Sequence, residues 1–277
     1  MPRTRTTARG RRPLLILGVI GVLMLAACGG AASQAPTSGS DGSTGQGDTP
    51  TATPAPTVGT DGRIVPGDGG TAFASATTAL DALDSYAFRV EIASTSIEGD
   101  ATTFSRTLMS GVVVNRPEKA SSLEQSDLDK DGNVTSSSGT IVIGAEAWIR
   151  SDPAGPWTAI PAAQADIMIQ SMAAFRPEQM FGLYFAGIGG NFTSVGNETR
   201  NGVKATHYKG DEAIGAILGA IAGFQGTWSS DAWIANDGGF LVHSEASAEA
   251  PAGSKAGSFL IMVDITDPNS AGPIKRP

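Results

Sequence analysis

The hydrophobic period changes abruptly about a third of the way along this chain of 277 residues. Apolar residues recur at helical spacing over 71–85, where Phe73, Ala76 and Leu80 fall on one side of a helix. The period then becomes two, because apolar and polar residues alternate over 86–92. We therefore expect an amphipathic helix that runs directly into a half-buried strand.

Further strand-like segments follow at short intervals, and several are separated by turn sequences such as Asn201-Gly202 that tolerate positive φ. Consecutive hairpins favour an antiparallel meander over a parallel sheet. The pattern predicts an α+β fold in one folded region, residues 71–267, followed by a short tail, 268–277. The remaining predicted strands span 103–114, 119–128, 134–143, 146–150, 192–199, 202–209, 227–235, 240–248 and 256–266.

Two helical zones interrupt the strands. The first, 162–188, contains Met168, Met172 and Met180 among aromatic residues, and its second helix begins at Pro177. Methionine adapts to variable apolar shapes, so this zone lines a binding site or simply covers the sheet with core side chains. The second zone, 211–224, has three glycines spaced four residues apart, which permits close packing or, alternatively, a mobile lid.

The N-terminus carries a separate signal. Five arginines and no acidic residue precede an apolar run that ends at residue 27, the pattern of a secretory signal peptide. The run is shorter than the roughly 20 residues of a membrane span, which disfavours an uncleaved anchor helix. Leu25-Ala26-Ala27-Cys28 resembles the lipobox of bacterial lipoproteins. That resemblance implies cleavage of residues 1–27 and acylation of Cys28 on the outer face of the cell membrane, with the general secretory and twin-arginine export routes both open.

Residues 28–70 are dominated by Gly, Ser, Thr and Pro, a composition that cannot bury enough apolar surface to fold. We expect a disordered stalk with a root-mean-square reach of roughly 35 Å. The leader holds five of the 19 basic residues and none of the 27 acidic ones, so the chain from Cys28 carries a net charge of −13. This charge disfavours nucleic acid and anionic membrane surfaces as partners.

Signals for catalysis and metal binding are weak. His207 and His243 are the only histidines, both lie in predicted strands, and no set of nucleophile and base accompanies them. The Asp-x-Asp-x-Asp-Gly run over 127–132 matches half of a calcium loop, but Ser138 occupies the position of the expected bidentate acid. A polar hairpin turn is the main interpretation of this run, and a weak calcium site is the alternative. We expect no enzymatic activity, no cofactor and no metal.

Three parts of the folded region carry a family resemblance: the helix-to-strand run over 79–88, the segments 143–149 and 155–160, and the strand–turn–strand over 231–242. They resemble the LolA/LolB-like lipid-carrier superfamily, in particular its LppX/LprG-type lipoproteins. The resemblance implies a strongly curved antiparallel half-barrel of about ten or eleven strands, with helices covering its concave face around an apolar cavity. It also implies that the acyl chains of lipids or lipoglycans are bound and carried within the cell envelope.

On this interpretation the two helical zones supply the cavity lining. The alternative is an anchored scaffold or sensor domain with the same fold and no ligand. The candidate lining residues are Ile167, Met168, Met172, Phe175, Met180, Phe181, Ile214, Ile217, Leu218 and Ile221.

Overall fold

The computed structural model describes residues 69–98, 101–185 and 189–277, so the expected leader, lipobox and most of the stalk lie outside the described residues. No helix in these ranges is long and apolar enough to cross a membrane. The elements are α1 (Gly69–Ala82), β1 (Ser85–Glu98), β2 (Ala101–Val114), β3 (Ala120–Leu128), β4 (Val134–Ile143), β5 (Glu146–Arg150), β6 (Thr158–Ala159), α2 (Ala162–Ala174), α3 (Pro177–Phe185), a 3-10 turn (Gly189–Asn191), β7 (Phe192–Arg200), β8 (Val203–Gly210), α4 (Glu212–Ala222), β9 (Thr227–Ala235), β10 (Leu241–Glu249) and β11 (Ala256–Thr266).

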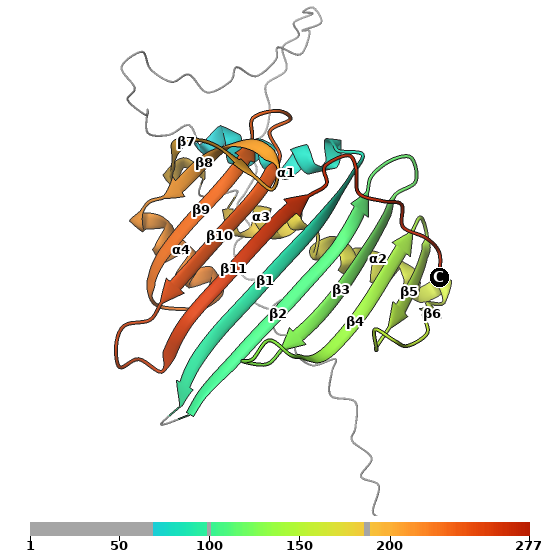
Figure 1. The fold of residues 1–277 in the computed structure, drawn as a ribbon, viewed down its shortest axis with the longest axis horizontal. Coiled ribbons are helices and arrows are strands. Elements are labelled where there is room, and N and C mark those ends of the chain that lie inside the picture. The colour runs from blue at the N-terminus through green and yellow to red at the C-terminus, as the bar shows by residue number, and fades with distance from the viewer. Residues whose placement is uncertain (1–68, 99–100, 186–188) are drawn as a thin grey trace, which may run out of the picture. The chain divides into compact units, whose positions relative to one another are not determined.

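The strands form one antiparallel sheet of eleven strands in the order β6-β5-β4-β3-β2-β1-β11-β10-β9-β8-β7. The first and last strands therefore pair at its centre, and β6 and β7 are its two open edges (Figure 1). The helices lie behind the sheet in Figure 1, on one of its faces. The structure confirms the predicted α+β class, an antiparallel curved sheet that does not close into a barrel.

Strand alternation gives the sheet an inner face toward the helices. Cross-strand pairing places Tyr86, Val113, Ser121, Val142 and Ala147 in one row across β1 to β5. Four of these five side chains are buried, and Ser121 is the small polar member of the row. Burial of such rows against helices supplies the main favourable free energy of folding.

Aromatic side chains attach α1 to the rest of the fold. The ring of Phe73 lies 4.4 Å from that of Phe192, 5.5 Å from that of Phe181 and 5.6 Å from that of Tyr208, measured between centroids. Aromatic pairs at such distances stabilise packing beyond the area that they bury. The helix ends at Ala82 and not at the predicted residue 85, because β1 already begins at Ser85.

Most predicted elements are present with small shifts in their bounds. Asn201 and Gly202 form the predicted two-residue hairpin, with φ of 50° and 78°. The zone 162–188 divides into α2 and α3, and its last three residues lie outside the described ranges. The two-residue strand β6 was not predicted, since a segment so short and exposed has no alternation to detect.

The residues after β11 cross the ends of the central strands toward β5 (Figure 1). The backbone N–H of Asn269 donates to the carbonyl of Ser85 over 2.7 Å. Further on, Arg276 pairs with Glu146 at 2.7 Å and with Glu118 at 3.3 Å. Residues 268–277, expected as a tail, thus make specific contacts with the folded region.

Candidate functional site

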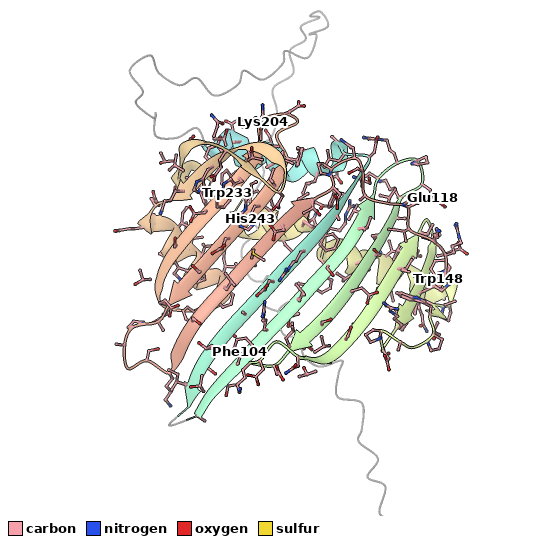
Figure 2. The ribbon with its side chains drawn as sticks, in the orientation of Figure 1. Phe104, Glu118, Trp148, Lys204, Trp233 and His243 are labelled. Carbon is pink, nitrogen blue, oxygen red and sulfur yellow. The ribbon has the colours of Figure 1, made fainter. Side chains whose placement is uncertain are left out.

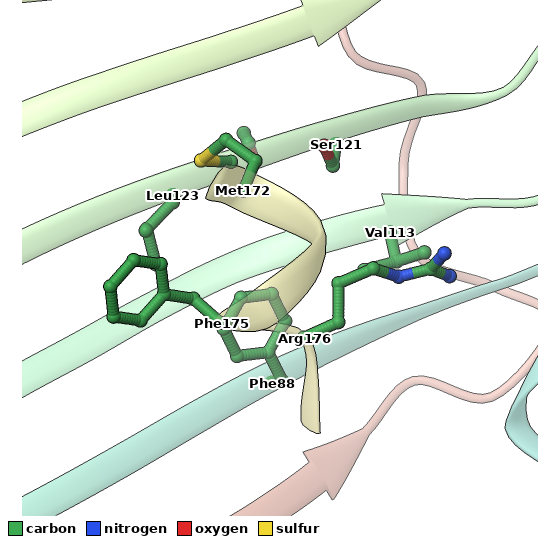
Figure 3. Close-up of a pocket in the computed structure, with 8 residues that line it drawn as sticks. Phe88, Val113, Ser121, Leu123, Met172, Phe175 and Arg176 are labelled. Carbon is green, nitrogen blue, oxygen red and sulfur yellow. The ribbon is translucent and has the colours of Figure 1, made fainter. Parts of the chain in front are cut away.

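A recess of about 170 Å³ lies between α2 and the inner face of β2, β3 and β4. Next to it is a small cavity of about 10 Å³, in which Met172 and Phe175 face the strands (Figure 3). The recess is lined by Val113, Val114, Asn115, Lys119, Ala120, Ser121, Val142, Gly144, Ile169, Met172, Ala173 and Arg176.

The strand pattern explains the floor of the recess. Val113, Ser121 and Val142 are consecutive members of the inner row, so they face α2 together. The serine side chain is smaller than its two neighbours, and it lines both the recess and the adjoining cavity. A large side chain here would occupy the space that Ser121 leaves open.

The helix above the recess is held weakly. Its N-cap is Pro161, which makes no side-chain capping hydrogen bond, so the amides of the first turn lack this partner. Only Ala165 and Met172 of α2 are buried, whereas Ile167 is 67 % exposed. A helix with so little burial is stabilised weakly by tertiary packing.

The C-terminal end of α2 is held differently, by a polar cluster at the junction with α3. The hydroxyl of Tyr86 donates to Glu178 Oε2 over 2.7 Å, and Arg176 Nε lies 2.7 Å from Glu178 Oε1. Arg176 also donates to Asn115 Oδ1 over 3.0 Å, while the amide of Asn115 donates to the carbonyl groups at the end of α1. The cluster joins α1, β1, β2 and α3 at one point.

Electrostatics within this cluster fix the protonation states. Burial raises the pKa of the Tyr86 phenol well above its ordinary value, and the charge of Glu178 raises it further. Burial alone lowers the pKa of Arg176, but Glu178, Tyr86 and Asp81 together outweigh burial, so the pKa is raised. Tyr86 therefore remains a neutral donor, and Arg176 and Glu178 form a charged pair.

The six candidate lining residues of the zone 162–188 differ in where the structure places them. Met172 and Phe175 contact the recess or the adjoining cavity. Met168 and Met180 are partly buried against the core, and Phe181 is fully buried beside α1. Ile167 faces away from the sheet, as its exposure shows.

The four candidates of α4 lie elsewhere. Ile214 and Leu218 are each 1 % exposed, whereas Ile217 and Ile221 are 37 % and 38 % exposed. No residue of α4 lines the recess, so the structure does not bring the two helical zones together around it. The expectation had missed the strand side chains of the floor, although their alternation in the sequence marks an inner face.

The glycines of α4 serve packing and termination. A Cβ added at Gly215 would lie 3.2 Å from the Cβ of Trp228, and one added at Gly219 would lie 2.9 Å from the backbone oxygen of Phe224. Gly223 ends the helix with φ of 66°, in the left-handed region that glycine adopts readily. The close-packing alternative therefore describes this helix.

Both histidines lie in a side-chain network on the outer face of the sheet, opposite the helices. His243 and Trp233 are neighbours there (Figure 2), and the strand register pairs His207 with Trp233. His243 is fully buried; its Nδ1 lies 2.7 Å from Asp264 Oδ1, and its Nε2 lies 3.0 Å from Arg200 Nη2. Because a guanidinium only donates, Nε2 of His243 accepts the hydrogen bond from Arg200, and the Nδ1–H group donates to Asp264. The guanidinium of Arg200 stands 4.9 Å over the ring of Trp233, on which His207 also stacks at 4.2 Å. Both histidines thus hold the sheet together.

The half-matched calcium loop is a hairpin turn between β3 and β4. Asp129 Oδ1 accepts hydrogen bonds from the backbone N–H groups of Asp131 and Asn133. Asp127 bonds instead to Thr107 and Ser136 on the neighbouring strands. Within the described ranges, no group of three or more His, Cys, Asp or Glu side chains is arranged to hold a metal ion.

No protein-family model and no curated protein matches the sequence. Among solved structures, LprF from Mycobacterium bovis is 13 % identical with a TM-score of 0.43, covering 77 % of this chain and 98 % of its own. Lipoprotein LppX from Mycobacterium tuberculosis is 15 % identical with a TM-score of 0.38, over 74 % and 97 % of the two chains. A LolA superfamily protein from Nitrosomonas europaea is 10 % identical with a TM-score of 0.23, over 74 % and 94 %. LppX and the LolA superfamily are named both in these structures and in the resemblance noted from the sequence.

Proposed function

We propose that the chain is a membrane-anchored envelope lipoprotein that binds an acyl chain of a lipid or lipoglycan beneath α2 and acts as its carrier. The observation that carries this proposal is the recess itself, which has a mainly apolar lining and lies under a helix with few buried side chains. Sites for apolar ligands are concave and lined mainly by apolar side chains with a few polar groups, and this recess has that composition.

The size of the recess limits what fits without movement. Its volume of about 170 Å³ is close to that of an engineered cavity of about 150 Å³ that takes up benzene, a six-carbon molecule. Burial of a six-carbon stretch of acyl chain contributes about 5 kcal/mol before ordering costs. A longer chain needs additional room, which displacement of α2 from the sheet would provide.

The anchoring part of the proposal rests on the lipobox-like sequence that ends at Cys28. One acyl chain gives only marginal membrane binding, and two or three give stable attachment. We propose a binding role rather than catalysis because His207 and His243 are both engaged in the contacts of the outer network. The predicted stalk, which gives way to α1 at Gly69, would then hold the domain near the outer face of the membrane.

The deciding experiment measures lipid directly. Organic extraction of the purified protein, followed by mass spectrometry, should yield about one lipid per chain, and the delipidated protein should bind a fluorescent fatty acid. Ser121→Phe, which fills the floor of the recess, should abolish this binding while the thermal transition is retained. Ala220→Phe is the matched control, because Ala220 is exposed on α4, away from the recess.

A second candidate function is the scaffold or sensor domain without a ligand. The volume of about 170 Å³ favours it, since ligand pockets commonly measure about 300–1,000 Å³. Under this alternative the extract contains no lipid and the parent protein does not bind the fatty acid. Ser121→Phe then changes only the stability of the domain. That set of results would reject the carrier function.

A further inference from the structure

The composition of α4 does not match its position at the surface. Glu212 is the only charged residue of the helix, and no charged residue follows it before Asp231. A helix that is apolar on all sides is ordinarily buried within a protein or in a membrane. In this fold α4 covers β9 on the helix-bearing face of the sheet and has one side open to solvent (Figure 1).

The inner side of α4 is fully used by the fold. Ile214 and Leu218 are buried, and Gly215 and Gly219 bring the helix backbone against Trp228. This close approach leaves α4 no role in lining the recess, and none of its residues contributes to it. The outer side consists, after the first residue, of exposed apolar side chains alone: Ala213, Ala216, Ile217, Ala220 and Ile221.

We propose that this outer face, the α4 face, docks onto the surface of a lipid bilayer. The inference rests on the anchoring part of the proposed function. Forty residues lie between Cys28 and Gly69. If they form the coil that their composition predicts, their reach is roughly 35 Å, so an anchored domain stays close to the bilayer. An exposed apolar patch held at such a distance meets the headgroup region repeatedly, where Ile side chains leave water at the boundary with the acyl chains.

Size and charge favour a bilayer over a protein partner. A helix of eleven residues is about 16 Å long and about 10 Å wide, far smaller than the roughly 800 Å² per partner of a stable protein interface. A bilayer requires no matched surface of that area. The net charge of −13 from Cys28 onward disfavours anionic lipid, so zwitterionic phosphatidylcholine is the lipid that the face should accept.

The test uses the chain from residue 28 to 277 with Cys28→Ala, so that no acyl group contributes to membrane binding. Sedimentation with phosphatidylcholine vesicles should carry this protein into the pellet. The double variant Ile217→Asp/Ile221→Asp should lower vesicle binding by about tenfold or more, because charge is disfavoured at an apolar membrane contact. Ile167→Asp is the matched control: Ile167 is even more exposed, at 67 %, but lies on α2.

A gain-of-binding variant keeps the test decisive if the aspartates disturb folding. Ala216→Trp should strengthen vesicle binding, since tryptophan favours the membrane interface, and its fluorescence should shift to shorter wavelength. Three results would overturn the proposal. The first is equal pelleting with and without vesicles, and the second is an equal loss of vesicle binding in Ile167→Asp. The third is a dimer that forms without lipid and that Ile217→Asp/Ile221→Asp dissociates. Fatty-acid binding by the same variants reports separately on the recess: its absence in the parent rejects the carrier function and leaves α4 docking standing.

Discussion

Tyr86→Phe tests whether the polar cluster at the end of α2 stabilises the fold. The phenol is fully buried and donates to Glu178, which is 4 % exposed. Phenylalanine keeps the ring and its packing, so the change removes the hydroxyl without opening a large cavity. A hydrogen bond to a charged group contributes about 1.5–3 kcal/mol. We expect the free energy of unfolding to fall by that amount, or the melting temperature to fall by roughly 3–12 °C for a domain of this size.

Urea unfolding followed by tryptophan fluorescence measures this change, and a double-mutant cycle isolates the pair. Glu178→Leu removes the acceptor, so Tyr86→Phe in that background should cost less, with a coupling energy of about 1 kcal/mol or more. A loss below about 0.5 kcal/mol for Tyr86→Phe, or strictly additive effects in the cycle, would refute the reasoning. Unchanged m-values would show that the variants unfold from equally compact states.

Three further predictions concern separate features. Gly219→Ala should lower the melting temperature, although helix propensity alone favours alanine by about 1 kcal/mol, because the new Cβ would lie 2.9 Å from the backbone oxygen of Phe224; a rise would contradict the packing assignment. Burial raises the pKa of Asp264, but hydrogen bonds from His243 and Asn201 together with nearby positive charge, including Arg200, outweigh burial and hold the pKa below its ordinary value. Below about pH 4 the unfolded state therefore binds more protons at Asp264 than the folded state does, and the stabilisation that the Asp264 carboxylate provides is lost. Thermal melts should show that Asp264→Asn is less stable than the parent at pH 5 and that its melting temperature falls less on acidification. Cys28→Ala should move the exported protein from the membrane to the soluble fraction, and retention after a high-salt wash would exclude acyl anchoring.

The sheet was predictable because its signals are local. Alternation over 86–92 and the Asn201-Gly202 turn both specify structure within a few residues, and both are found. Hairpin succession then limits the topology, since neighbouring strands in the chain become neighbours in the sheet. The pairing of β1 with β11 is different, because it joins segments about 170 residues apart. No local pattern in the sequence specifies this pairing, and it was not predicted.

The site was predicted only in part, for a physical reason. Helical periodicity assigns residues to faces of a helix, but it does not say how closely the helix approaches the sheet. Met172 and Phe175 were predicted as cavity-lining residues, and the structure places them at the recess or the small cavity beside it. Ile217 and Ile221 fit the same apolar pattern, and the structure exposes them because α4 has apolar residues on every side.

The two helical zones differ in what fixes their distance from the sheet. In α4, two glycines set the distance at backbone contact with Trp228, and Asp211 caps the helix through the N–H groups of Ala213 and Ile214. In α2, the side chains of Met168, Ile169 and Met172 pack against the core, and the N-terminus has no side-chain cap. The recess lies under α2, and Arg176, which follows this helix, donates a hydrogen bond to Asn115. Room for a longer acyl chain is therefore most accessible through displacement of the N-terminal turns of α2, since the same displacement of α4 would break a close backbone contact and a helix cap.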